Sequence, residues 1–91
     1  MSRDESRREP SVFPGFAGIE ARRRRLVADL AARRRQLGLS QAEIAARMGT
    51  SQPAVARLES GAADVRLTTL ERYAVAVGQR LDWRLRTHDK R

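Results

Sequence analysis

The sequence contains no cysteine and a single histidine, His88, which lies in a polar C-terminal stretch. Without cysteine, neither disulfides nor thiolate metal sites can stabilise the chain, and a reducing, cytoplasmic compartment is expected. One histidine in a tail provides neither a cluster of metal ligands nor a general base. The sequence also has no glycine-rich phosphate loop and no paired carboxylates. We therefore predict a binding protein and not an enzyme, with no metal and no cofactor.

Long apolar runs are missing as well. No stretch approaches the roughly 18 residues of a transmembrane helix, and the N-terminus lacks the apolar centre of a signal peptide. The basic residues before position 26 accompany an apolar stripe that is short and free of aromatic residues, which disfavours a helix lying on a membrane surface. We expect no membrane association, and 91 residues allow one small domain.

Positive charge is abundant. The chain has 19 Lys and Arg residues against 11 Asp and Glu, a formal net charge of +8, and Lys90 is its single lysine. This balance suits a polyanionic partner, most simply nucleic acid. Arginine and alanine also accumulate in chains encoded by GC-rich genomes, so composition leaves both explanations open.

The first part of the chain divides into an arm and a helix. Residues 1–18 mix charges with Ser, Pro and Gly without periodicity, which predicts a disordered arm. Over residues 19–37 an apolar face recurs at spacings of four and seven, as in a helix. Its leucines are Leu26, Leu30 and Leu37. The four arginines at 22–25 point in every direction around this helix, so that end is predicted to project beyond the core. Gly38 should end the helix with a left-handed cap.

Two short helices are predicted next, in the stretch LSQAEIAARMGTSQPAVARLESG. Ser40 and Glu43 form a capping box at the start of the first, and Ser51 caps the second. Pro53 falls in the first turn of the second helix, where a missing N–H has no partner to lose. Each helix has an apolar stripe and a closing glycine: Ile44, Ala45, Met48 and Gly49, then Val55, Leu58 and Gly61. Two short capped helices joined by such a turn constitute a helix-turn-helix.

The periodicity changes near the C-terminus. Residues 62–67 are expected to form a loop, after which Thr68 or Thr69 caps a fourth helix. Its apolar stripe and closing glycine are Leu70, Ala74, Val77 and Gly78. Over residues 80–86, RLDWRLR alternates apolar and charged positions, which is typical of a β-strand. The strand's apolar face comprises Leu81, Trp83 and Leu85, and residues 87–91 form a polar tail.

The run from about Leu26 to Leu81 resembles the lambda-repressor-like (Xre-type) helix-turn-helix domain, above all in GLSQAEIAARMGTSQPAVARLESG. The resemblance implies an all-α fold, a lambda-repressor-like bundle whose third helix enters the DNA major groove. We expect the domain over residues 19–79, with the motif at 41–60, and a short C-terminal strand for dimerisation over residues 80–86.

The third helix carries the expected base-reading residues, which are Gln52, Pro53, Ala54 and Arg57. The major groove is about 12 Å wide, so small side chains such as Ala54 allow close approach. Glutamine suits the N6 and N7 atoms of adenine, arginine suits O6 and N7 of guanine, and small apolar groups suit a thymine methyl. In repressors of the family the position of Pro53 is often polar, so here it would contact a base only by van der Waals packing.

The resemblance also implies phosphate contacts and a structural ion pair. Helix termini and short polar groups bind phosphates, and the implied contacts are Ser40, Gln41 and Ser51, with Arg47 and Arg66 as looser candidates. Gln41 should also lie near Gln52. Arg34 and Glu59 match a pair that, in related repressors, ties the first helix to the end of the third.

A lone strand at residues 80–86 would have no partner in its own chain and would be prone to aggregation. Pairing with the same strand of a second copy across a two-fold axis resolves this, and it demands a palindromic operator. The alternative is a short fifth helix, as in phage repressors. The strand ending resembles small antitoxins of the HigA and HipB kind. Two functions follow: a homodimeric repressor, or an antitoxin that also masks a cognate toxin, with residues 1–18 wrapping the toxin or touching DNA.

Overall fold

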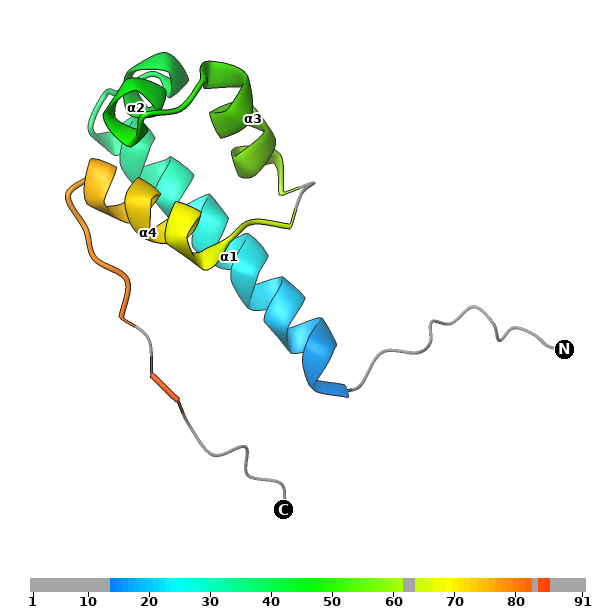
Figure 1. The fold of residues 1–91 in the computed structure, drawn as a ribbon. Coiled ribbons are helices and arrows are strands. Elements are labelled where there is room, and N and C mark those ends of the chain that lie inside the picture. The colour runs from blue at the N-terminus through cyan, green and yellow to red at the C-terminus, as the bar shows by residue number, and fades with distance from the viewer. Residues whose placement is uncertain (1–13, 62–63, 83, 86–91) are drawn as a thin grey trace, which may run out of the picture.

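A computed structural model describes residues 14–61, 64–82 and 84–85 of the chain. Its helices are α1 (Pro14–Gln36), α2 (Gln41–Met48), α3 (Gln52–Ser60) and α4 (Leu67–Ala76). Figure 1 shows α1 as a long diagonal rod, with α2 and α3 gathered around its C-terminal end and α4 crossing it. The all-α fold expected from the sequence is confirmed.

The hydrophobic core forms where α4 and the helix pair α2–α3 meet the second half of α1. Its largest fully buried side chains are Val27, Leu30, Ile44, Val55, Tyr73 and Val77. Contacts join α2 to α3 and α4, and α1 to α3 and α4, so every helix contributes to one core. Buried positions in α1 begin at Val27, which leaves the arginines at 22–25 on a part of the helix that extends past the core.

Local capping sets the ends of α2 and α3. The backbone N–H of Glu43 donates to Ser40 Oγ at 3.0 Å, and the N–H of Ser40 donates to Glu43 Oε1 at 2.7 Å, which completes the capping box. The N–H of Ala54 donates to Ser51 Oγ at 3.3 Å. Gly49 ends α2 with a φ of 71°, a left-handed conformation that glycine adopts without steric cost.

The predicted helix ends need three corrections. Residues 14–18, assigned to the arm, belong to α1, because Pro14 is preorganised for a first helical turn and each further residue adds a hydrogen bond. Leu37 follows the last residue of α1 and is 43 % exposed instead of facing the core, while Leu39 packs against the core. α4 begins at Leu67 with Arg66 as its N-cap, so neither Thr68 nor Thr69 caps it.

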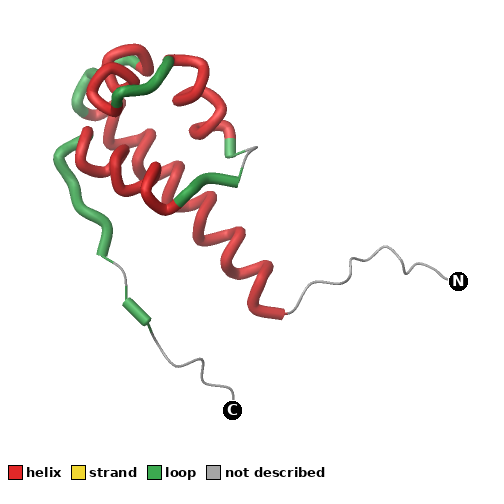
Figure 2. Tube along the Cα trace, viewed as in Figure 1, coloured by secondary structure: helices red, strands yellow, loops and turns green. Residues whose placement is uncertain are grey.

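The C-terminal segment does not form the predicted strand. Residues 79–82, 84 and 85 have no regular secondary structure, neither a strand nor a fifth helix, and Figure 2 draws them as loop. A β-strand requires a neighbouring strand to accept and donate its backbone hydrogen bonds, and the described part of this single chain offers none. Leu81 packs against the chain's own core instead, whereas Leu85 is fully exposed. Trp83, residues 1–13 of the predicted arm, and residues 86–91 lie outside the described residues.

Candidate nucleic-acid interface

The exposed side of α3 carries the predicted base-reading residues. Gln52, Pro53, Ala54 and Arg57 are all exposed, because Val55 and Leu58 turn the opposite side of the helix into the core. The guanidinium of Arg57 is bonded to no residue that the structure describes. The exposed side of α3 therefore presents a slim surface with one amide and one cation, which matches what a major groove admits and reads.

Behind α3, the carboxylate of Glu59 is the centre of a hydrogen-bond network. Arg34 donates to it twice, from Nε to Oε2 at 2.8 Å and from Nη2 to Oε1 at 3.1 Å. The hydroxyl of Tyr73 donates to Oε2, and Gln41 Nε2 donates to Oε1 at 2.9 Å. The side chains of Arg34 and Glu59 are only 11 % and 8 % exposed, so this pair is largely shielded from water. The structure thus brings together α1, α2, α3 and α4 at one carboxylate.

The network holds Glu59 ionised. Burial raises the pKa of its carboxyl group, but the hydrogen bonds from Arg34, Tyr73 and Gln41 outweigh burial and leave the pKa below its ordinary value. For Tyr73, burial and the neighbouring carboxylate both raise the pKa of the phenol, so the hydroxyl keeps its proton and remains a donor. The guanidinium of Arg34 also donates to the carbonyl of Leu39 at 2.8 Å, which fixes the turn between α1 and α2.

The network reaches the surface at the start of α3. Gln52 Nε2 donates to Gln41 Oε1 at 2.7 Å, so the two glutamines expected to lie near each other are in direct contact. Gln41 is half-buried and Gln52 is exposed. A continuous chain of hydrogen bonds therefore runs from the buried Tyr73 through Glu59 and Gln41 to Gln52, a predicted base-reading residue.

The predicted phosphate-binding residues fall into two groups. Ser40, Ser51 and Arg66 are exposed at the N-termini of α2, α3 and α4, where free backbone N–H groups favour anions. Arg66 provides no side-chain cap for α4. Arg47 lies elsewhere: its Nη1 donates to the carbonyl of Ala76 at 3.0 Å and ties α2 to the last turn of α4.

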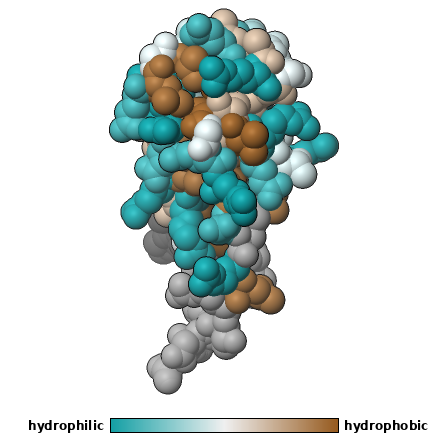
Figure 3. Space-filling view, turned by 90° about the vertical axis from the view of Figure 1, so that its left-hand side faces the viewer, coloured by the Kyte–Doolittle hydropathy of each residue, from teal (hydrophilic) through white to brown (hydrophobic). Residues whose placement is uncertain are grey.

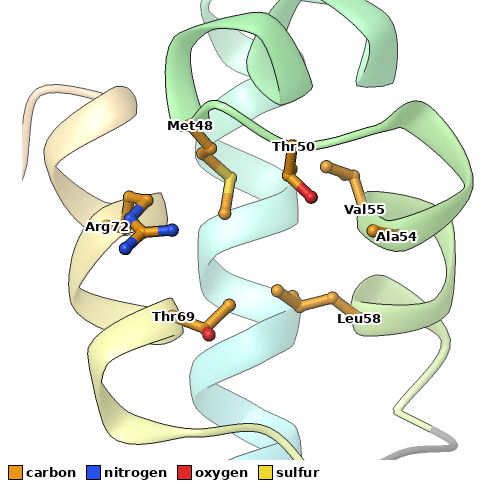
Figure 4. A pocket seen from close by; sticks show the side chains of 7 residues that line it. All are labelled: Met48, Thr50, Ala54, Val55, Leu58, Thr69 and Arg72. Carbon is orange, nitrogen blue, oxygen red and sulfur yellow. The ribbon is translucent and has the colours of Figure 1, made fainter.

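Two hollows flank α3. The smaller, of about 90 Å³, lies between α3 and α4, with Ala54, Val55 and Leu58 on one wall and Thr69 and Arg72 on the other (Figure 4). A wider, open hollow of about 390 Å³ is lined by residues that include Arg57 and Arg66. Arg57 from α3 and Arg66 from the start of α4 thus share one depression beside α3. Among the described residues there is no group of His, Asp or Glu side chains that could hold a metal ion.

The sequence did not reveal three features of the site: the bond of Tyr73 to Glu59, the place of Arg72 in the wall of the smaller hollow, and the bond of Arg47 to Ala76. Tyr73 sits beside Ala74 in the apolar stripe of α4, so periodicity could have marked it as buried, but no local pattern indicates a bond to a carboxylate fourteen positions earlier.

No helix within the described ranges has the length and hydropathy needed to cross a membrane.

Comparison with known proteins places this geometry in a family. A family model described as helix-turn-helix matches residues 30–84, which spans α2, α3, α4 and α1 from Leu30 onward. No curated protein and no solved structure matches the chain.

Proposed function

Because the chain belongs to the lambda-repressor-like (Xre-type) helix-turn-helix family and is a DNA-binding regulator, we propose that it is a homodimeric repressor of a palindromic operator. The exposed side of α3 carries this proposal. There Gln52 and Arg57 offer the hydrogen-bonding groups that read adenine and guanine, with Ala54 between them small enough for close approach. Pro53 would add a van der Waals contact.

Phosphate contacts would set the position of α3 in the groove. Ser40 and Gln41 at the start of α2, Ser51 at the start of α3 and Arg66 at the start of α4 support contacts to the DNA backbone, because helix N-termini attract anions. Arg47 is exposed but already bonded to Ala76, so a phosphate would have to share its guanidinium. In this proposal the Arg34–Glu59 pair is structural and holds α1 against the end of α3.

Exposed apolar side chains support a dimer. Val75 is 70 % exposed on α4 and Leu85 is fully exposed in the C-terminal segment. Figure 3 views the side of α4 and this segment, where separate hydrophobic groups stand among hydrophilic ones. We propose that residues 80–86 of two copies pair as antiparallel strands, which supplies the ladder partner that one copy lacks. Trp83 and Leu85 would then form the seam, while Leu81 stays in its own core.

Selection from random-sequence DNA duplexes tests the proposal. The expected product is a palindrome whose half-sites lie about 10–10.5 base pairs apart, one helical turn, because a two-fold dimer places two α3 helices on one face of the duplex. Recovery of no common sequence, or of a single unrepeated half-site, would overturn the repressor proposal.

The affinity for duplex DNA is expected to fall as salt rises. Log K should decrease linearly with log salt, with a slope of about −0.9 for each phosphate neutralised, because bound arginines release counterions. Titration of a fluorescent duplex at several salt concentrations measures the slope. Weak binding that salt does not change would exclude nucleic acid as the partner.

Substitutions on α3 should separate base reading from phosphate binding. Arg57→Ala and Gln52→Ala are each expected to weaken operator binding by about 1–3 kcal/mol and to change binding to random DNA little. Arg66→Ala is the control, because loss of a phosphate contact weakens both and lowers the salt slope by about 1. If Arg57→Ala weakened operator and random DNA equally, Arg57 would be a phosphate contact and not a base reader.

A further inference from the structure

The hydrogen-bond chain behind α3 has a direction. A carboxylate can only accept hydrogen bonds, so the group that Gln41 turns toward Glu59 must be its NH₂. The carbonyl oxygen of Gln41 then faces the other way and must accept from Gln52, which it does through Gln52 Nε2 at 2.7 Å. The ionised carboxylate of Glu59 therefore determines the orientation of two amides in series.

This direction decides what Gln52 presents to a base. One of its two N–H groups is used on Gln41, which leaves its carbonyl oxygen and one N–H for the groove. Adenine shows a donor at N6 and an acceptor at N7, which matches that pair of groups. Guanine shows two acceptors, O6 and N7, and an unrestrained glutamine could turn both N–H groups toward them. The orientation found here would instead set the carbonyl oxygen of Gln52 against one of these two acceptors, where no hydrogen bond can form.

Tyr73 controls this orientation from inside the core. Glu59 Oε2 is occupied by Arg34 Nε and by the hydroxyl of Tyr73, which leaves Oε1 to Arg34 Nη2 and Gln41. Tyr73 is fully buried, and its hydroxyl donates to Oε2, the carboxylate oxygen that Gln41 does not use. Without that hydroxyl, Oε2 keeps only the bond from Arg34 Nε, so the carboxylate is held less firmly and positions Gln41 less firmly.

We propose that Tyr73 and Glu59 are positioning residues for sequence recognition, which make Gln52 select adenine over guanine by fixing the direction of the Gln41 and Gln52 amides. The inference rests on the proposed function, because it assigns a base preference to the same site. It also assigns a role in specificity to a buried tyrosine that touches no DNA.

Tyr73→Phe tests the proposal through its affinity for duplexes that carry adenine or guanine at the base pair that Gln52 contacts. Wild type should prefer adenine by about 10- to 100-fold, and Tyr73→Phe should reduce this preference about three- to tenfold while affinity for the adenine duplex changes less. Val77→Ala is the matched control, since it destabilises the same helix and has no polar group to offer Glu59. It should keep the full preference.

Glu59→Gln gives the sharper outcome, because an amide at position 59 can donate to Gln41 and reverse the chain. Gln52 could then turn both N–H groups toward the groove, so the preference should move toward guanine. In a Gln52→Ala background, Tyr73→Phe should have no further effect on the adenine-to-guanine ratio. Two outcomes would overturn the positioning role while leaving DNA binding intact. One is an adenine-to-guanine ratio that Tyr73→Phe does not change, and the other is an equal fall in this ratio when Gln52 is already alanine. A wild-type protein without sequence preference would overturn the proposed function as well.

Discussion

Trp83→Asp is expected to convert the proposed dimer to a monomer and to reduce affinity for the proposed operator by about three orders of magnitude. In the proposed dimer, Trp83 lies near the two-fold axis in an apolar seam, where a buried, unpaired carboxylate is strongly unfavourable. Each monomer retains one α3, so only the linkage between half-sites is lost. Because binding of the second half-site is intramolecular in a dimer, that linkage accounts for most of the operator affinity.

Sedimentation at micromolar concentration and operator titration measure this effect. The variant should keep its helical circular dichroism and retain weak binding to random DNA, because the described core residues of α1–α4 are unchanged. Arg84→Asp is the matched control for sedimentation, since alternation along a strand turns the neighbouring side chain to the other face. A wild-type monomer, or a Trp83→Asp protein that stays dimeric, would rule out the strand-mediated dimer.

Glu59→Ala is expected to lower the free energy of unfolding by about 3 kcal/mol, which for a domain of this size corresponds to a fall in Tm of roughly 10–20 °C. The substitution leaves Arg34 charged and only 11 % exposed without its partner, and it removes the acceptor of the Tyr73 hydroxyl. Glu20→Ala is the control, because Glu20 pairs with Arg23 and Arg24 on the part of α1 outside the core. An exposed pair contributes about 0–1 kcal/mol.

The difference in stability between wild type and Glu59→Ala is expected to depend on pH. Because the pKa of Glu59 is lowered in the folded protein, its ionised form adds stability above the ordinary glutamate pKa of about 4.3, and this contribution disappears as the pH falls through the lowered pKa. Wild type and Glu59→Ala should therefore approach each other in stability in acid. Equal melting temperatures at neutral pH would show that the pair contributes nothing.

The helix-turn-helix could be predicted because the signals that define it are local. The capping box of Ser40 and Glu43 spans one helical turn, and Ser51 caps α3 through the N–H of Ala54, three residues on. Such bonds form between neighbours in any chain that starts a helix, so their pattern is visible in the order of the residues. The exposure of Gln52, Pro53, Ala54 and Arg57 follows, because burial of Val55 and Leu58 turns these four positions to solvent.

Signals that need a partner far along the chain, or on another chain, were less informative. The alternation over residues 80–86 predicted a strand, but a strand exists only with a neighbour, and Leu81 packs into the chain's own core instead. The start of α4 was placed too late, at Thr68 or Thr69, because threonine is a common N-cap, whereas the chain enters the helix at Leu67 without any side-chain cap.

The sequence by itself determined the presence of the helices and the exposed side of α3, because caps and apolar periodicity act within one or two helical turns. It also determined the positive charge of the chain, which composition alone gives. Only the tertiary structure decided how that surface is held. Tyr73 reaches Glu59 across 14 residues and Arg47 reaches Ala76 across 29. These bonds depend on how helices cross, and no spacing along the chain encodes a crossing. The direction of the Gln52 amide, and with it the base that we propose Gln52 selects, depends on the bonds that join Tyr73, Glu59 and Gln41.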